Sequence, residues 1–177
     1  MATTKATHAC TNCGRPVKPE SRNYRYTESG LSNIVLQGID VADCPRCGNT
    51  DVTIPRVAKI HRAIARALAS SPGRLTGEQF RFLRKHLGHS GEQLAGYLHT
   101  DKTKVSKWER GEDPIGHASD RLMRLLVAAL DTEMVGDVSS IAAHLPEISN
   151  KPGNDFELHV DAVRLTTAFH GRALTRN

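Results

Sequence analysis

Residues 90–111 read SGEQLAGYLHTDKTKVSKWERG, and this stretch decides much of the fold. Ser90 and Gln93 have the spacing of a capping box, in which each side chain bonds the backbone N–H of the other residue. Asp101 suits the start of a second helix, because its carboxylate accepts an N–H and favours the positive helix end. Gly111 suits a helix exit, where left-handed backbone is common. The stretch therefore predicts two short helices joined by a tight turn.

Apolar and polar residues fall on different faces of these two helices. Leu94 and Ala95 share one face of the first helix, while Val105 and Trp108 lie three residues apart in the second. We expect both sets to face inward. The second helix then presents a polar and basic outer face, made of Lys102, Thr103, Lys104, Ser106 and Lys107. This is the layout of a DNA-reading helix-turn-helix.

A surface helical hairpin with a merely solvated lysine face is the alternative interpretation. It does not account for the joint placement of two caps, the small Ala95 at the helix crossing, the apolar pair and the terminal glycine. Because these independent positions agree, the sequence favours DNA binding.

The stretch resembles the Xre/Cro-type helix-turn-helix of phage repressors and many antitoxins. The resemblance implies that Lys102, Thr103 and Lys107 reach base edges, and that Lys104 and Ser106 lie nearer to the phosphates.

The match runs without a gap through the tripeptide Glu109-Arg110-Gly111. It also implies an ion pair between Glu109 and Arg84 of the preceding helix. Gly91 departs from the pattern, since many members carry a phosphate-gripping glutamine there.

The four cysteines form two Cys-x-x-Cys turns separated by 30 residues, namely Cys10, Cys13, Cys44 and Cys47. Each pair is followed by a glycine, which lets backbone N–H groups approach the sulfurs. Two such turns supply the tetrahedral sulfur set of a structural zinc site, so we expect one Zn²⁺. Iron takes the same ligands. Two disulfides are disfavoured in a cytosolic protein, and a redox dithiol needs no duplicate. His8 is expected to be a solvated tail residue.

Between the cysteine pairs the sequence favours strands. Residues 23–27 and 33–41 carry alternating apolar side chains, and Gly30 between them suits a turn. We expect a small antiparallel sheet on the metal knuckles. Such a domain buries too little apolar surface to fold without its metal.

A paired cysteine knuckle followed by this helix-turn-helix resembles the MqsA (YgiT-type) antitoxin family over residues 8–134. The resemblance implies that the zinc domain holds a ribonuclease-type toxin and that the helix-turn-helix represses its own operon as a dimer. Thr103 and Lys107 stand where the family usually has Asn and Arg. The operator sequence is therefore expected to differ.

Residues that break secondary structure divide the rest of the chain into domains. A zinc-binding domain with an exit helix at 57–69 covers residues 8–69, and residues 70–75 form a Ser/Pro/Gly linker. The helix-turn-helix and dimerisation domain covers 76–134, beginning with a capped helix at 76–87. Residues 135–177 are a C-terminal extension without an assigned role.

A helix over 119–133 carries more apolar residues than a small bundle needs, namely Leu122, Leu125, Leu126, Ala129 and Leu130. Part of this stripe is expected in the core and part in a dimer seam, since a two-fold pair of recognition helices enters successive major grooves about 34 Å apart. In the extension we expect a short helix at 141–145, a break at 151–154 and a strand through Phe156, Leu158 and Val160.

Bulk composition narrows the function classes. The net charge of +5 over 177 residues suits an anionic partner. The chain has neither an apolar run of membrane-spanning length nor the apolar core of a signal peptide, so a cytoplasmic location is expected. No Ser/His/Asp set or phosphate-binding glycine loop points to an enzyme.

The sequence thus predicts a mixed fold, in which a small zinc-bound antiparallel β domain (α+β) precedes an all-α Xre/Cro-type helix-turn-helix domain. The predicted function is a repressor that binds a palindromic double-stranded DNA operator as a homodimer, and an antitoxin with a ribonuclease-type toxin as partner and no membrane association. Two alternatives stay open. One is a stand-alone zinc-containing regulator without a toxin, and the other is a thiol redox or metal-transfer protein that uses the cysteines.

Overall fold

The first third of the chain forms a β-rich arm in the computed structural model, which describes residues 6–153 and 156–171. Its main strands are β3 (Glu20–Arg25) and the ten-residue β4 (Ile34–Asp43), which pair antiparallel. A 3-10 turn, η1 (Thr27–Ser29), joins them and ends at Gly30 with φ +77°. β5 (Thr50–Thr53) pairs with the end of β4. The two predicted strands are confirmed, with β3 starting three residues earlier than expected.

The end of the chain returns to this sheet. β8 (Phe156–Asp161) lies parallel to the first half of β4, and β9 (Thr167–Gly171) pairs antiparallel with β8. The predicted strand through Phe156 is confirmed, but β9 was not predicted. The predicted antiparallel pairing of the two strands between the cysteine pairs is confirmed, but the parallel strand β8, which was not assigned to this sheet, makes the five-stranded sheet mixed. A parallel partner arrives only through a long crossover, which local sequence patterns do not reveal.

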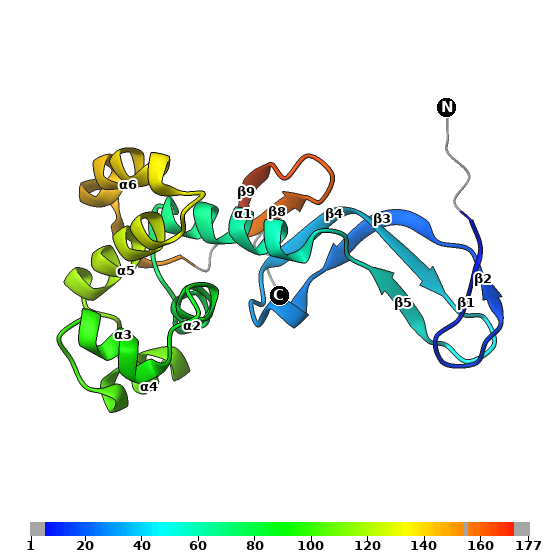
Figure 1. The fold of residues 1–177 in the computed structure, drawn as a ribbon, viewed down its shortest axis with the longest axis horizontal. Helices are drawn as coiled ribbons and strands as arrows, with labels where there is room; N and C mark the ends of the chain where they lie inside the picture. The colour runs from blue at the N-terminus through cyan, green and yellow to red at the C-terminus, as the bar shows by residue number, and fades with distance from the viewer. Residues whose placement is uncertain (1–5, 154–155, 172–177) are drawn as a thin grey trace, which may run out of the picture.

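The cysteine turns close the far tip of the arm. There, β1 (His8–Ala9) pairs with β2 (Pro16–Val17). The tip and the helices lie at opposite ends of an elongated molecule (Figure 1).

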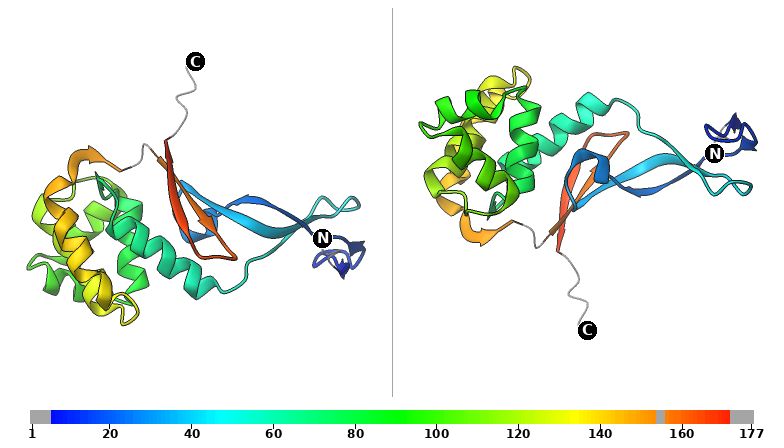
Figure 2. Two further views of the ribbon diagram at one scale, coloured as in Figure 1. Left: turned by 90° about the horizontal axis from the view of Figure 1, so that it is seen from above. Right: turned by 90° about the horizontal axis from the view of Figure 1, so that it is seen from below.

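Helix α1 (Val57–Ala69) leads from the arm to the helices, as both views in Figure 2 show. It has the predicted bounds. Its inward residues Ile60, Ile64 and Leu68 are fully buried. They belong to one apolar core that runs from Leu36 of β4 into the helical body.

The helical body follows the order expected for the second half of the chain. Its α-helices are α2 (Gly77–His86), α3 (Gly91–Tyr97), α4 (Lys102–Arg110), α5 (His117–Leu130) and α6 (Val138–His144). Two 3-10 turns flank α6, namely η2 (Val135–Asp137) and η3 (Leu145–Glu147). The predicted helices at 76–87 and 141–145 are confirmed with small shifts. α2 opens with the expected capping box between Thr76 and Gln79.

Helix α5 departs from its prediction in two ways. It starts at His117 rather than at 119, and ends at Leu130 because Asp131 adopts extended backbone. Its fully buried side is also not the predicted leucine stripe. The buried residues are Asp120, Met123, Arg124, Val127 and Ala128. Within the predicted stripe, Leu125 and Leu126 are half-buried and pack against the apolar core, as expected for its core part. Leu122, Ala129 and Leu130 are exposed, and the expected dimer seam stays a prediction.

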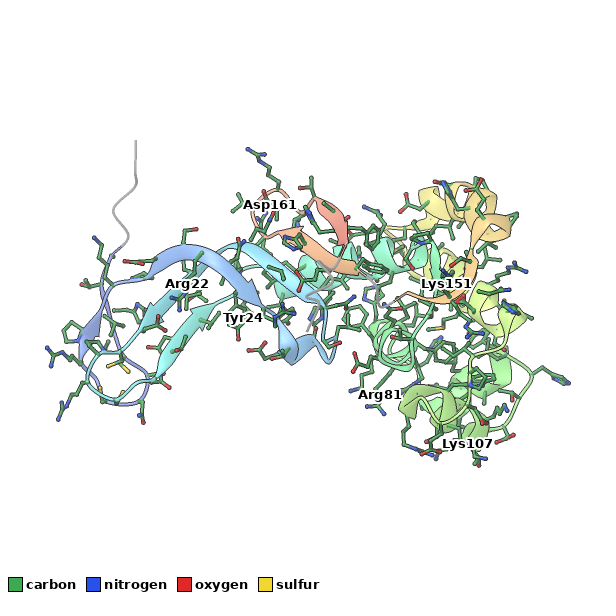
Figure 3. The ribbon with its side chains drawn as sticks, turned by 180° about the vertical axis from the view of Figure 1, so that it is seen from behind. Arg22, Tyr24, Arg81, Lys107, Lys151 and Asp161 are labelled. Atoms are coloured by element: carbon green, nitrogen blue, oxygen red, sulfur yellow. The ribbon has the colours of Figure 1, made fainter. Side chains whose placement is uncertain are left out.

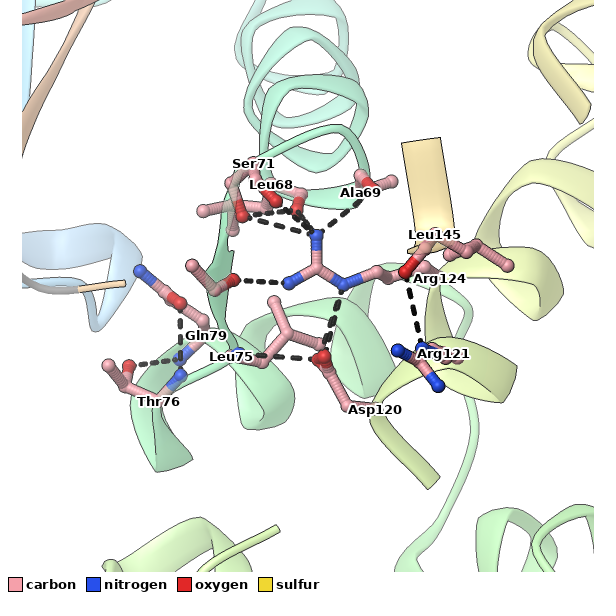
Figure 4. Close-up of polar contacts among 11 residues, drawn as sticks. Leu68, Ala69, Ser71, Leu75, Thr76, Gln79, Asp120, Arg121, Arg124 and Leu145 are labelled. Atoms are coloured by element: carbon pink, nitrogen blue, oxygen red, sulfur yellow. Dashed lines mark hydrogen bonds and ion pairs between the residues drawn. The ribbon is translucent and has the colours of Figure 1, made fainter. Parts of the chain in front are cut away.

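Arg124 explains why the inward face was misjudged. Its guanidinium is fully buried and lies 3.2 Å from Asp120 Oδ1. It donates to the carbonyl oxygens of Ser71 and Gly73, each at 2.6 Å, and to those at the end of α1 (Figure 4). In a helical sequence pattern, a charged residue normally predicts a surface position. Here Arg124 is buried instead and holds the segment between α1 and α2.

That segment is further held by the C-terminal part of the chain. β6 (Gly73–Arg74) pairs in parallel with β7 (Ser149–Pro152). A Cβ on Gly73 would lie 2.6 Å from Gly153 Cα, so the two backbones need a glycine at this crossing. The predicted break at 151–154 is therefore wrong at its start, where the chain is still a strand; Asn154 lies outside the described residues.

Among the described residues, every helix is too short or too polar to cross a membrane.

Candidate nucleic-acid interface and metal centre

Helix α3 starts as its sequence predicts. Ser90 Oγ accepts a bond from the Gln93 backbone N–H at 3.1 Å, and Gln93 Oε1 accepts one from the Ser90 N–H at 2.8 Å. Leu94 and Ala95 are buried on the side that packs against α4. The capping box and the inward face are thus confirmed.

Helix α4 is fixed at both ends by the predicted residues. Asp101 Oδ1 accepts the Lys104 backbone N–H at 2.8 Å, and Gly111 ends the helix with φ +73°. Val105 and Trp108 are 1% and 5% exposed. These two anchors set the rotation of α4 about its axis, and therefore decide which side chains face out.

The predicted outer face of α4 is present. Lys102, Thr103, Lys104 and Lys107 are exposed, and Ser106 is half-buried. Lys107 lies at the outer end of the helical body (Figure 3).

The five side chains differ in what they contact. Lys104 Nζ lies 3.1 Å from Asp113 Oδ2, and Ser106 Oγ accepts a bond from Arg110. Lys102, Thr103 and Lys107 make no side-chain hydrogen bond or ion pair in the part of the chain that the structure describes, although the charge of Lys107 helps to lower the pKa of Glu112. The three residues expected to meet base edges therefore keep their hydrogen-bond donors available, whereas the contact with Asp113 was not expected from the sequence.

A buried carboxylate ties α4 to α2. Glu109 accepts bonds from Arg84 Nε at 2.5 Å and Arg84 Nη2 at 3.0 Å, which is the pair that the helix-turn-helix resemblance implied. Arg81 adds a longer contact of 3.4 Å, and its side chain lies on the same end of the body as Lys107 (Figure 3). The hydrogen bond to Glu109 raises the pKa of Arg84, so the guanidinium stays charged. This bidentate pair holds α4 at a fixed angle to α2.

At the other end of the molecule the four cysteine sulfurs come together. All four lie within 4.8 Å of one another and none is in a disulfide. Cys10 Sγ is 3.8 Å from Cys47 Sγ, and Cys13 Sγ is 3.6 Å from Cys44 Sγ. A tetrahedron with Zn–S bonds of about 2.3 Å has sulfur–sulfur edges of about 3.8 Å. These two sulfur–sulfur distances therefore match the edges of a four-thiolate metal site.

The two cysteine turns have the same backbone geometry. Gly14 N–H donates to the Cys10 carbonyl and Gly48 N–H to the Cys44 carbonyl, both at 2.9 Å. Both glycines have φ near +70°, a conformation that other residues adopt only with strain. The glycine after each pair is thus required by the turn itself.

The surrounding protein groups shift the pKa values of these cysteine thiols in different directions. Backbone N–H groups of Cys47 and Arg46 lower the pKa of Cys44 to about 6. At Cys13 a backbone bond from Arg15 lowers the pKa, but burial and the three neighbouring sulfurs outweigh it and raise the pKa to about 12. Four adjacent thiolates repel one another, so a cation is needed to ionise all of them.

An acidic residue that the sequence did not single out braces the first turn. The Asp51 carboxylate accepts bonds from the backbone and hydroxyl of Thr11 and from Asn49 Nδ2. His8 Nε2 lies 3.5 Å from this carboxylate. His8 is exposed, as predicted, but it lies in β1 and not in a tail. The hydrogen bond from Thr11 lowers the pKa of Asp51 and keeps it ionised. The position of Asp51, four residues after Cys47, could have indicated from the sequence that it lies near the cysteine turns.

Protein-family models, curated proteins and solved structures contain no match to this chain.

Proposed function

We propose that this protein binds double-stranded DNA in a sequence-specific way and represses transcription. One observation carries the proposal: Val105 and Trp108 anchor α4 so that Lys102, Thr103 and Lys107 are turned outward and make no side-chain hydrogen bond or ion pair with the described residues. A short helix that presents polar and basic side chains at one end of a small helical body fits the major groove.

The proposed roles follow the contacts of each side chain. Lys102, Thr103 and Lys107 read base edges, because their donors are free. Lys104 and Ser106 position the helix on phosphates. For Lys104 this requires exchange of Asp113 for a phosphate, which an exposed ion pair permits at little cost.

A homodimer on a palindromic operator is the proposed binding unit. One helix of nine residues contacts few bases, whereas two copies related by a two-fold axis reach successive major grooves.

The test uses the full chain loaded with zinc. Selection from a random duplex library should yield a palindromic consensus, and Lys107→Ala should relax base choice at one position per half-site, at a cost of about 1–3 kcal/mol. Lys104→Ala should weaken binding to all sequences and flatten the salt dependence. Lys18→Ala, an exposed lysine on the arm, is the control. Parent-like affinity and selectivity of Lys107→Ala would refute the base-reading role.

We further propose that the protein is an antitoxin with a structural zinc ion. Support comes from the resemblance stated above and from the size of the sulfur tetrahedron. Expression of the adjoining reading frame alone should arrest growth, and co-expression with this chain should relieve the arrest. If no neighbouring product is toxic, the stand-alone regulator is the better interpretation.

A thiol redox or metal-transfer role makes the opposite prediction for the cysteines. In the zinc-loaded protein we expect thiols that resist alkylation and a metal that resists mild chelation. Rapid alkylation of Cys44 with release of the metal would favour the redox or transfer role.

A further inference from the structure

Strand β9 forms one outer edge of the five-stranded sheet (Figure 2). Its five residues, Thr-Ala-Phe-His-Gly, are all exposed. β8 covers one of its two edges, and no strand in the described part of the chain covers the other.

The hydrogen bonds of β8 show which groups of β9 face outward. Leu158 N–H donates to the Asn33 carbonyl, and Ala162 N–H to that of Gln37, so even-numbered residues of β8 face β4. Odd-numbered ones face β9, as the bond from Asp161 N–H to the Thr166 carbonyl confirms. In the antiparallel register, Ala168 and His170 then bond to β8.

It follows that the backbone N–H and C=O groups of Thr167, Phe169 and Gly171 point to the open edge. Together they form a short template for another strand.

The opposite edge of the sheet, β3, is protected in ways that β9 is not. β3 carries Glu20, Arg22 and Arg25, and its ladder is interrupted by a register shift after Arg22. Arg22 pairs with Asp43 at 2.7 Å and Arg25 with Glu157 at 2.6 Å. Charges and bulges of this kind prevent strand addition. β9 has no Lys, Arg, Asp, Glu or Pro.

We propose that β9 pairs antiparallel with β9 of a second copy, about a two-fold axis at Phe169. The axis sets Phe169 opposite its own copy and Thr167 opposite Gly171, so that every outward group meets a complementary one. The uncharged edge creates no like-charge contact with itself, and a two-fold contact closes at two chains instead of forming fibres.

Phe169 gives this contact an apolar centre. It is 40% exposed and its ring lies 4.6 Å from that of Phe156, edge to face. In the pair of chains, the two Phe169 rings meet across the axis and each remains against its own Phe156. The contact would join the sheets of two arms into one sheet of ten strands.

This contact supplies the dimer that the proposed function needs, but it depends on none of the DNA contacts. Sedimentation equilibrium of the full, zinc-loaded chain without DNA therefore tests it separately. The parent should be a dimer. Thr167→Pro removes an outward N–H while leaving all bonds to β8, and Thr167→Lys adds a charge to the edge. Each should weaken the dimer at least about tenfold.

Asn23→Lys is the matched control, because it places the same charge on the already protected β3. It should dimerise like the parent. Circular dichroism and zinc content should be unchanged in all three variants, which separates a lost contact from a lost fold.

Cross-linking tests the register. Directly bonded residues in antiparallel strands have Cα atoms about 5.5 Å apart, within disulfide range. Mild oxidation should therefore link Phe169→Cys into dimers but not Val163→Cys, which is 64% exposed in the β8–β9 turn. A monomeric parent would overturn the proposal. So would undiminished dimers of both Thr167 variants, which would point to another surface such as the exposed leucines of α5.

Discussion

The helical body and the cysteine tip are held together by different interactions. In the body, Phe80, Leu83, Leu94 and Met123 are fully buried in one large apolar core. At the tip, the separate cluster of buried residues consists only of Cys10, Val17, Ala42 and Cys44. Two of these four residues are cysteines of the sulfur group. The body can fold by apolar burial, whereas the tip depends on what its sulfurs hold.

The boundary between these two regimes lies within the arm. Ile39 and Val41 of β4 belong to the large core, and Ala42 of the same strand belongs to the tip cluster. The large apolar core includes residues on both sides of the segment 70–75, and Arg124 holds this segment by hydrogen bonds. The structure on either side of the segment is therefore stabilised by shared interactions. Loss of the proposed metal should therefore destabilise the tip side of the arm after Val41 and have little effect on the stability of the helical body.

Removing one sulfur ligand gives the largest expected effect and tests this contrast directly. If the sulfurs hold zinc as proposed, Cys44→Ser should abolish tight binding of the ion, which contributes about 10–16 kcal/mol in small zinc domains. Limited proteolysis should then cut within the tip, while the urea midpoint of the helical signal at 222 nm changes little. Asn12→Ser, an exposed position inside the first cysteine turn, is the control. A helical transition that moves as far as the tip would show that the two regions fold as one.

The next largest effect is expected inside the body. Arg124→Met leaves the Asp120 carboxylate buried with only its bond from the Leu75 N–H, and frees the carbonyls that Arg124 serves. Breaking a buried pair in this way costs about 3–5 kcal/mol. Urea unfolding followed at 222 nm measures it.

Arg121→Met is the matched control on the same helix. Arg121 is half-buried and makes one bond of 3.2 Å to the Leu145 carbonyl, so its loss should cost about 1 kcal/mol. Equal losses for both variants would show that Arg124 is not the main support of residues 70–75.

What the sequence predicted correctly depends on neighbours in the chain. The capping boxes, the Asp101 cap and the glycine after each cysteine pair act over two to four residues. The sulfur cluster was predictable because its two halves are Cys-x-x-Cys-Gly turns with the same backbone geometry, and such a turn brings its two sulfurs close together.

What it did not predict depends on distant partners. β4 meets β8 more than a hundred residues later, and β6 meets β7 across the whole helical body. Arg124 looks like a surface residue until the carbonyls around it are known. Polar groups satisfied by remote segments give no local signal, and for that reason no role was assigned to the C-terminal extension from the sequence.

The junction between arm and body is expected to respond to mild acid. Tyr26 of the arm bonds His61 of α1 at 2.9 Å, and His61 lies edge to face with Phe82 of α2. Burial lowers the pKa of His61, and the nearby His86 lowers it further. The unfolded chain, with a histidine pKa of about 6.5, therefore binds more protons just below that pH. Stability is full above about pH 6.5 and falls as pH drops towards the folded pKa.

His61→Gln should flatten this slope, because glutamine can still bond Tyr26 but does not titrate. The free energy of unfolding, measured at several pH values between about 5 and 8, should show a smaller decline than in the parent. His117→Gln, an exposed histidine at the start of α5, should leave the parent slope intact. An unchanged slope in His61→Gln would place the acid sensitivity in another part of the molecule.

The smallest expected effect concerns the surface of the body, where charges are paired but screened. Asp113→Asn releases Lys104 from an exposed ion pair and should change stability by less than about 1 kcal/mol. If Lys104 meets phosphate, the variant should bind operator and unrelated duplexes a few-fold more tightly, with a steeper salt dependence. Glu147→Gln removes the same charge from the remote turn η3 and controls for net charge. Adding Lys104→Ala to Asp113→Asn should abolish the gain. If Glu147→Gln gains as much as Asp113→Asn, the effect is one of overall charge, and Lys104 has no special position at the DNA.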